Sequence, residues 1–241
     1  MSERKIRFVI FDTFGTVVDW HGSVVAEGRR LGEKYGINID WPKFVNTWRD
    51  DGYIKAIFET AKGLRPYELV DKIHLKKLEE LLVQYGFTNI SEADKQHFNL
   101  VWHRLNPWAD AVSGLTELKK DFSIGPFSNG DFRLILDMAK SAGLPWDFVA
   151  TADLFKKFKP DPEIYKDVAK LLNAHPSEIV MVAAHLFDLD GAKMAGFTTI
   201  FVPRPLEYGK NSDHVEPTGI HAPDYTINAF TELPELIKNL G

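Results

Sequence analysis

The sequence of 241 residues contains no cysteine, which excludes disulfide bonds, thiolate nucleophiles and sulfur-ligated metals. It also has no excess of positive charge, because it contains 29 basic and 34 acidic residues. We therefore expect no nucleic acid partner. No apolar run approaches the roughly 20 residues of a membrane span, and the first residues lack the apolar stretch of a signal peptide. These absences predict a cytoplasmic protein without a membrane partner.

Two kinds of cofactor motif are missing as well. The stretch GTVVDWHG, residues 15–22, has neither the lysine of a nucleotide phosphate loop nor the glycine triplet of a dinucleotide-binding turn. His97 and His103 are too poorly spaced to bind a metal from one face of a helix. We therefore expect no cofactor and no resident metal ion.

The second half of the chain alternates between apolar segments and amphipathic ones. The apolar segments are short, and they have the sequences FSIGPFSNG, FVATAD, EIVMVAA and TTIFVPRP. Segments with helical patterning follow the first three of them. Such an alternation predicts an α/β fold, with a doubly wound, Rossmann-like parallel sheet that helices cover on both faces.

The residues between the first strand and this alternation show helical patterns and no strand pattern. Residues 41–59 and 67–86 have apolar side chains at helical period, and Gly86 stands where the second helix should end. Residues 91–105 begin with a Ser-x-x-Asp capping signal and end before Pro107. The pattern indicates a helical domain inserted after the first strand.

We therefore predict a core domain formed by residues 1–19 and 107–241, with a helical cap domain over residues 20–106. The long polar segment 203–223 has three open interpretations: a lid, an oligomer contact or a surface excursion.

A carboxylate, Asp12, directly follows the apolar strand at residues 8–11. Burying it is costly unless it has partners. Ser128 and Asp188 fall at the ends of two later strands, and ligands of doubly wound sheets bind at the carboxyl ends of strands. We expect these three residues to meet in a functional site, although an aspartate after a strand is also a common turn residue.

Four strand-end segments carry a family resemblance. They are DTFGT at 12–16, SNG at 128–130, KPDPEIY at 159–165 and AAHLFDLDGA at 183–192. In this order and spacing they resemble the haloacid dehalogenase superfamily over essentially the whole chain. The resemblance implies that the helical block is the cap domain of that superfamily.

The sequence departs at two places from the magnesium-dependent phosphatases that dominate the superfamily. Phe14 stands where those enzymes have a second aspartate that protonates the leaving alcohol. Ala183 and Ala184 replace a Gly-Asp pair whose carboxylate binds magnesium. Because magnesium favours several oxygen ligands, these departures disfavour a phosphatase.

The charges of the expected site favour the same conclusion. Asp12 and Asp188 supply two negative charges, and Lys159 and Arg49 supply two positive ones, so the site is neutral without a metal and accepts a small monoanion. The pattern resembles the metal-free, type II L-2-haloacid dehalogenases. That resemblance implies hydrolysis of haloacetates and 2-halopropionates to 2-hydroxy acids through an aspartyl ester.

The resemblance also implies five catalytic residues. Asp12 matches the nucleophile, Thr16 holds its carboxylate, and Lys159 steadies the charge that moves during both steps. Tyr165 contributes a hydroxyl near this cluster, and Asp188 orients or activates the hydrolytic water.

Five further residues match substrate and halide positions. Phe14 and Phe187 are aromatic neighbours of the pocket, and Arg49 receives the departing halide from the cap. Ser128 binds the substrate carboxylate, and Asn129 contacts the halide.

His185 is the main departure within the subgroup, where many members have Ser-Ser-Asn in place of Ala-Ala-His. Our hypothesis is that this bulkier side chain narrows the pocket and favours haloacetates, including fluoroacetate. A purely structural and a catalytic role for His185 both stay open.

Simpler interpretations remain for three of these residues. Arg49 could be an exposed charge on a cap helix, and Ser128 and Asp188 could each cap the following helix. Competing functions are a magnesium-dependent phosphatase, a metal-free hydrolase of another electrophile such as a strained cyclic amino acid, and a non-enzymatic binding protein. The expected partner is a small halogenated carboxylate, and the aromatic-rich cap permits a homodimer.

Overall fold

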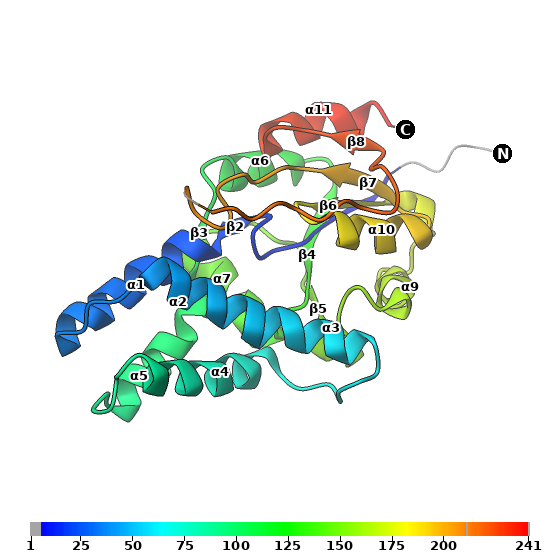
Figure 1. Ribbon diagram of the computed structural model, residues 1–241. Helices are drawn as coiled ribbons and strands as arrows, with labels where there is room; N and C mark the ends of the chain where they lie inside the picture. The colour runs from blue at the N-terminus through cyan, green and yellow to red at the C-terminus, as the bar shows by residue number, and fades with distance from the viewer. Residues whose placement is uncertain (1–5, 211, 241) are drawn as a thin grey trace.

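The computed structural model describes residues 6–210 and 212–240, and its core is one six-stranded parallel sheet (Figure 1). The strands follow the order β5-β4-β1-β6-β7-β8. Their bounds are β1 Phe8–Phe11, β4 Ser123–Ser128, β5 Ala150–Thr151, β6 Ile179–Ala183, β7 Thr198–Phe201 and β8 Tyr225–Thr226. The predicted α/β fold with a doubly wound parallel sheet is confirmed.

The register of the central strands decides where the functional residues lie. Phe11 at the end of β1 is aligned with Pro126 of β4 and with Val182 of β6. Because these pairs are parallel, the residues that follow each strand emerge at the same edge of the sheet. The buried strands are almost wholly apolar, as a sheet covered on both faces requires.

Helices cover both faces of the sheet, with α6 and α11 packed together above it and α9 and α10 below it in Figure 1. The core helices are α6 Ala111–Leu118, α7 Phe132–Ala142, α8 Ala152–Phe155, α9 Pro162–Leu171, α10 Leu186–Met194 and α11 Leu233–Lys238. Single turns of 3₁₀-helix precede β6 and α11, at Pro176–Glu178 (η3) and Phe230–Glu232 (η4).

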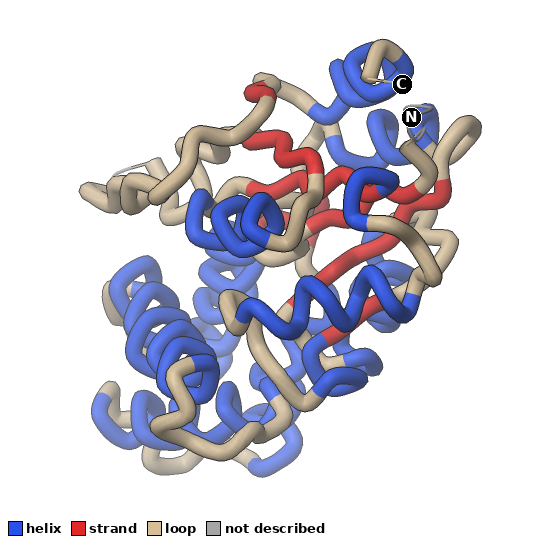
Figure 2. Tube along the Cα trace, turned by 90° about the vertical axis from the view of Figure 1, so that its right-hand side faces the viewer, coloured by secondary structure: helices blue, strands red, loops and turns tan. Residues whose placement is uncertain are grey.

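The block between β2 (Val18–Asp19) and β3 (Asn106–Pro107) is helical throughout its regular elements (Figures 1 and 2). These two short strands pair with each other at its base. The elements are α1 Trp20–Tyr35, α2 Trp41–Thr47, η1 Trp48–Ile54, α3 Lys55–Ala61, α4 Val70–Gln84, α5 Glu92–Asn99 and η2 Leu100–Arg104. Asn106, the last residue of the predicted cap range 20–106, belongs to β3, and the predicted domain bounds stay a prediction. Residues 1–5 of the predicted core segment lie outside the described residues.

The expected helix over residues 41–59 is divided into three parts. A π-helical stretch, η1, separates α2 from α3, and it carries Arg49. The other cap predictions hold: Ser91 accepts a hydrogen bond from the backbone N–H of Asp94 at 3.1 Å, and Gly86 follows α4 with a φ of 83°. Because π-helical turns often occur at functional sites, the position of Arg49 in η1 favours a functional role for this residue.

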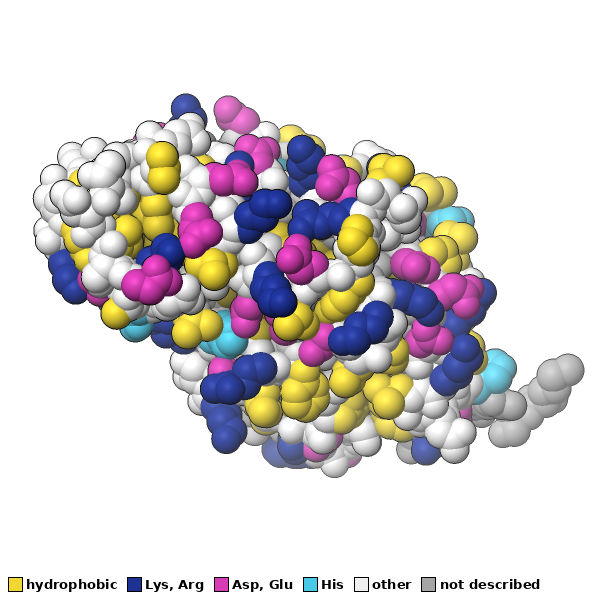
Figure 3. Space-filling view, turned by 90° about the horizontal axis from the view of Figure 1, so that it is seen from below, with side chains coloured by type: hydrophobic (Ala, Val, Ile, Leu, Met, Phe, Trp, Pro, Cys, Tyr) yellow, Lys and Arg dark blue, Asp and Glu magenta, His cyan; other side chains and the backbone are white. Residues whose placement is uncertain are grey.

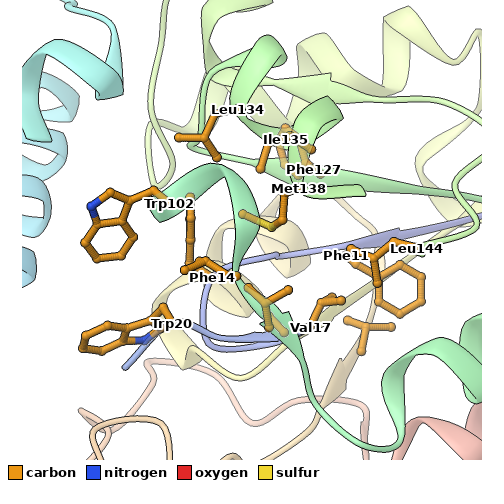
Figure 4. Close-up of a cluster of buried hydrophobic side chains, with 14 of the residues drawn as sticks. Phe11, Phe14, Val17, Trp20, Trp102, Phe127, Leu134, Ile135, Met138 and Leu144 are labelled. Atoms are coloured by element: carbon orange, nitrogen blue, oxygen red, sulfur yellow. The ribbon is translucent and has the colours of Figure 1, made fainter. Parts of the chain in front are cut away.

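Aromatic packing and one helix cap join the cap to the core. Phe14 packs edge-on against Trp102, which stacks on Trp20 (Figure 4). The carboxylate of Asp131 accepts hydrogen bonds from the first backbone N–H groups of α4, at 3.0 Å from Val70 and 2.9 Å from Asp71. Burial raises the pKa of Asp131 to about 6. These contacts hold the two parts together around the strand ends.

The outer surface has mixed charge. On the face seen in Figure 3, acidic and basic side chains alternate, without a broad field of one sign. Among the described helices, none has the length and apolar character needed to cross a membrane.

Candidate active site

Asp12 lies immediately after β1, and three side chains donate hydrogen bonds to its carboxylate. Thr16 Oγ1 lies 2.7 Å from Oδ2, and His185 Nδ1 lies 3.0 Å from the same oxygen. Lys159 Nζ lies 3.1 Å from Oδ1. One carboxylate oxygen therefore has two donors, and the other has a single donor.

Lys159 joins Asp12 to a second carboxylate. Its ammonium group, which is buried, also donates to Asp188 Oδ2 and to the backbone carbonyl of Phe127, at 2.7 Å from the latter. Tyr165 donates its hydroxyl proton to Asp188 Oδ1 at 2.8 Å. The predicted cluster of Asp12, Lys159, Tyr165 and Asp188 is thus assembled by strand ends and by α9 and α10.

The charges in this cluster determine its protonation. Burial alone would raise the pKa of Asp12, but Lys159 and His185 hold that pKa well below its usual range. Burial also acts against a charged Lys159, yet Asp12 and Asp188 raise its pKa. Asp12 is therefore an ionised, poorly hydrated carboxylate at neutral pH.

Asn129 fixes the backbone that carries Lys159. Its amide donates to the carbonyl of Lys159 at 3.0 Å, and its side-chain oxygen accepts from the N–H of Lys159 at 2.7 Å. Ser128 is buried, and its hydroxyl accepts a hydrogen bond from the backbone N–H of Gly130 at 3.1 Å. Asn129 borders the pocket described next, whereas Ser128 is not among its lining residues, so its expected role on the substrate carboxylate stays a prediction.

A cavity of about 130 Å³ opens beside Asp12, between the strand ends and the cap. Its walls are largely apolar, and its lining residues are Asp12, Phe14, Arg49, Tyr53, Ile54, Ile57, Phe58, Asn129, Lys159, His185, Phe187, Tyr208, His214, Glu216 and Pro217. The expected pocket residues Phe14, Arg49, Asn129, His185 and Phe187 all border it. Its volume suits a ligand of only a few heavy atoms.

Arg49 is the cationic residue that the cap contributes to this cavity. Its guanidinium is buried and lies over the ring of Trp20, 4.5 Å from the ring centroid. Within the described residues, its Nε and Nη1 atoms have no hydrogen-bond partner. An exposed Arg49, the simpler interpretation, is wrong; a buried guanidinium with free donors suits an anion.

The segment 203–223, whose role the sequence left open, supplies part of the site. Tyr208, His214, Glu216 and Pro217 line the cavity from this segment. Glu207 of the same segment is buried, and it accepts hydrogen bonds from Trp20 Nε1 at 2.8 Å and from His185 Nε2 at 3.1 Å. The segment is not merely a surface excursion.

Glu207 also corrects the expected charge count. Besides Asp12 and Asp188, the site holds the carboxylates of Glu207 and Glu216, and the imidazole of His185 lies beside Glu207. Two acidic and two basic residues therefore do not complete the site. A lone glutamate in a polar loop has no local pattern that distinguishes it from a solvated one. Only the folded chain brings it to His185.

Magnesium does not fit the residues at these positions. Phe14 and Ala184 stand where the phosphatases have carboxylates, and neither offers a ligand atom from its side chain. No group of three or more His, Asp or Glu residues in the described ranges could hold a metal ion.

Asp188 lies within the first turn of α10 rather than before it, so its alternative role as a helix cap is wrong.

Comparisons with known proteins find both dehalogenases and a phosphatase among the similar chains. A solved structure, the defluorinating L-2-haloacid dehalogenase Rha0230, is 35% identical, with 98% of this chain and 96% of that chain covered and a TM-score of 0.91. (S)-2-haloacid dehalogenase 1 of Pseudomonas sp. (strain CBS-3) is 25% identical over 98% of both chains. The glyceraldehyde 3-phosphate phosphatase of Pyrococcus furiosus is 31% identical, covering 98% of this chain and 94% of its own.

The model of the haloacid dehalogenase-like hydrolase family matches residues 6–196, which include the strand-end residues Asp12, Lys159 and Asp188. The chain therefore belongs to the haloacid dehalogenase-like hydrolases.

Proposed function

We propose that this protein is a hydrolytic dehalogenase that converts short 2-haloalkanoic acids to 2-hydroxy acids without a metal ion. One observation carries the proposal: an ionised, buried carboxylate lines a small apolar cavity that a buried guanidinium also lines, and two nitrogens of this guanidinium, Nε and Nη1, have no hydrogen-bond partner in the described residues. A carboxylate needs no general base to attack carbon, and a guanidinium stabilises a departing anion. The haloacid dehalogenases among its relatives support the same substrate class.

In the first step, an oxygen of Asp12 attacks C2 of the substrate, and the halide leaves with the bonding electron pair. Oδ1 suits this attack, because it has one donor whereas Oδ2 has two. The leaving halide would lie by Arg49, whose Nε and Nη1 are otherwise unpaired within the described chain. The product of this step is an ester of Asp12.

In the second step, water attacks the carbonyl carbon of this ester. Asp188 is the nearby carboxylate that can take the water proton, since it shares Lys159 with Asp12. The carbonyl oxygen becomes negative as water adds, and donors that already contact Oδ2 would stabilise it.

The phosphatase relative makes magnesium-dependent phosphate ester hydrolysis the competing function. Its chemistry requires a proton donor for the leaving alcohol and ligands for the metal. The side chain of Phe14, which packs against Tyr53 and Trp102, offers neither a proton nor a ligand atom. The dehalogenase proposal needs no group that is missing from the site.

We expect chloroacetate and (S)-2-chloropropionate to release chloride at rates that excess EDTA does not change. Ion chromatography or a halide electrode would measure this, with fluoroacetate included because a structural neighbour is a defluorinating enzyme. A matched panel of small phosphate esters with added magnesium serves as the comparison. Phosphate release that requires magnesium, with no halide release from any haloacid, would contradict the proposal.

The cavity should also limit the length of the substrate. Phe58 of the cap meets Phe187 of the core with ring centroids 5.2 Å apart, and His185 stacks on Phe187. We expect haloacetates to react faster than long-chain 2-haloacids. Phe58→Ala should raise kcat/KM for 2-chlorobutyrate relative to chloroacetate by about tenfold, the effect of one or two methylene groups in a pocket. The matched variant Phe132→Ala, at a half-exposed position on α7, should leave this ratio unchanged; an equal ratio in both variants would contradict the size limit.

A further inference from the structure

Glu207 is a buried carboxylate that the two-step scheme above does not use. Gly15, in the turn after Asp12, leaves the space for it, because a Cβ at Gly15 would collide with its carboxylate. Trp20 Nε1 and His185 Nε2 both contact the same oxygen, Oε1, and Arg49 Nη2 lies 3.5 Å from it. Glu207 is thus held in the site by specific contacts with Trp20, His185 and Arg49.

The hydrogen bonds of His185 determine its protonation state. Nδ1 faces Asp12 Oδ2 at 3.0 Å, and Nε2 faces Glu207 Oε1 at 3.1 Å. An ionised carboxylate can only accept, whereas a neutral imidazole has a single N–H group to donate. Both bonds form together when His185 is an imidazolium.

The surroundings favour this charge. Burial acts against a charged His185, but Glu207 and Asp12 raise its pKa well above the usual value. Glu207 in turn has a lowered pKa, despite burial, because of His185 and Arg49. The other charged or titratable groups around the cavity are Arg49, Tyr53, Lys159, Asp188, Tyr208, His214 and Glu216.

We propose that Glu207 is a positioning residue that keeps His185 as an imidazolium with its Nδ1–H directed at Asp12 Oδ2. Thr16 and His185 then form a two-donor site for the oxyanion of ester hydrolysis. This inference rests on the proposed function, and it assigns Glu207 to the second step only.

The chemistry of that step shows why Glu207 matters most there. Water adds to Cγ of the ester, one water proton passes to Asp188, and the carbonyl electron pair moves onto Oδ2. When the pair returns, the bond between Cγ and Oδ1 breaks, and Oδ1 leaves with the product and takes the proton from Asp188. The acid form of Asp12 then releases its proton to solvent.

While the ester exists, Asp12 has no charge. Of the two hydrogen-bond partners of His185, Glu207 is then the one that still carries a negative charge and stabilises the imidazolium. Without it, the buried imidazolium would lose its proton at a lower pH. A neutral ring is a weaker donor to an oxyanion than a charged one. Removing Glu207 should therefore slow ester hydrolysis at alkaline pH and spare the attack on C2.

Glu207→Gln tests this, because glutamine keeps the shape and an acceptor for Trp20 but has no charge. In the wild type, alkaline pH should slow ester hydrolysis far less than in the variant, because Glu207 and Asp12 raise the pKa of His185 well above its usual value. In the variant, steady-state turnover of chloroacetate should fall with rising pH by about ten- to a hundredfold. Rapid-quench measurements should still show a first-turnover burst of chloride, and mass spectrometry should find carboxymethylated Asp12. A profile parallel to the wild type, or equal slowing of both steps, would overturn the proposal.

Two variants test whether Glu207 acts through His185. Asp213→Asn removes an exposed carboxylate of the same segment that does not line the cavity, and it should keep the wild-type shape of the pH profile. In a His185→Gln background, Glu207→Gln should add no further pH dependence. An added dependence there would overturn the assignment.

A measurement on the wild type covers the case in which Glu207→Gln does not fold. Nitrogen NMR of the ¹⁵N-labelled histidine rings should show His185 protonated on both nitrogens at about pH 8, and a neutral ring would overturn the inference. Separate measurements test the two proposals. Absence of halide release would refute the dehalogenase activity, whereas NMR measures the protonation of the His185 ring in an enzyme that is not turning over substrate.

Discussion

Asp12→Asn is expected to reduce halide release from chloroacetate by about 10⁴-fold or more, because the amide oxygen is a poor nucleophile and carries no charge. The substitution keeps the shape of the side chain, so Thr16 can still donate to the single amide oxygen, Oδ1, of the asparagine. The matched variant Asp121→Asn, at a surface residue paired with Lys238, should retain full activity. Chloride release by a halide electrode, with circular dichroism to confirm folding, would measure both.

Labelled water distinguishes covalent catalysis by Asp12 from direct attack of water on the substrate. With wild-type enzyme in excess over substrate in ¹⁸O-labelled water, the label should enter the carboxylate of Asp12 first, because water attacks the ester at Cγ. Peptide mass spectrometry would locate it. Label that appears directly in the hydroxy acid, or substantial turnover by Asp12→Asn, would contradict the aspartyl ester.

The sheet could be predicted because each of its signals is local. Apolar runs of strand length alternate with helical patterns, and the parallel pairing then brings the ends of β1, β4 and β6 to one edge. The division of residues 41–59 could not be predicted, because a π-helix differs from an α-helix by less than one residue per turn. It depends on tertiary packing: a Cβ at Gly52 in η1 would lie 2.8 Å from Cβ of Lys77 in α4.

The site could be predicted where residues follow strands and could not where a loop returns to it. Asp12, Lys159 and Asp188 lie in segments whose motifs fix their positions, and the structure brings them together. Glu207 and Trp20 are 187 residues apart in sequence, and no pattern in the segment 203–223 indicates their contact. The sequence does not decide the role of His185 for the same reason, because nothing in it identifies Glu207 as the partner of His185.

Lys159→Met should have the second largest effect, on both activity and stability. The buried ammonium is the cation shared by Asp12 and Asp188, and its loss leaves two buried carboxylates close together. We expect halide release to fall by about a thousandfold and the free energy of unfolding to fall by about 3–5 kcal/mol. Lys157→Met is the matched control, because Lys157 makes a more exposed ion pair with Asp167 and should have a far smaller effect.

The stability deficit of Lys159→Met should depend on pH, and its sign follows from the carboxylates. In the wild type, Asp12 has a lowered pKa, so its ionised form stabilises the fold above the unfolded pKa and that stabilisation is lost as pH falls. Without Lys159, burial and mutual repulsion raise the pKa of the carboxylate pair, so the variant loses stability as pH rises. Urea denaturation should therefore show a larger deficit at about pH 8 than at about pH 5. A deficit that does not change with pH would mean that Lys159 stabilises the fold by packing rather than by its charge.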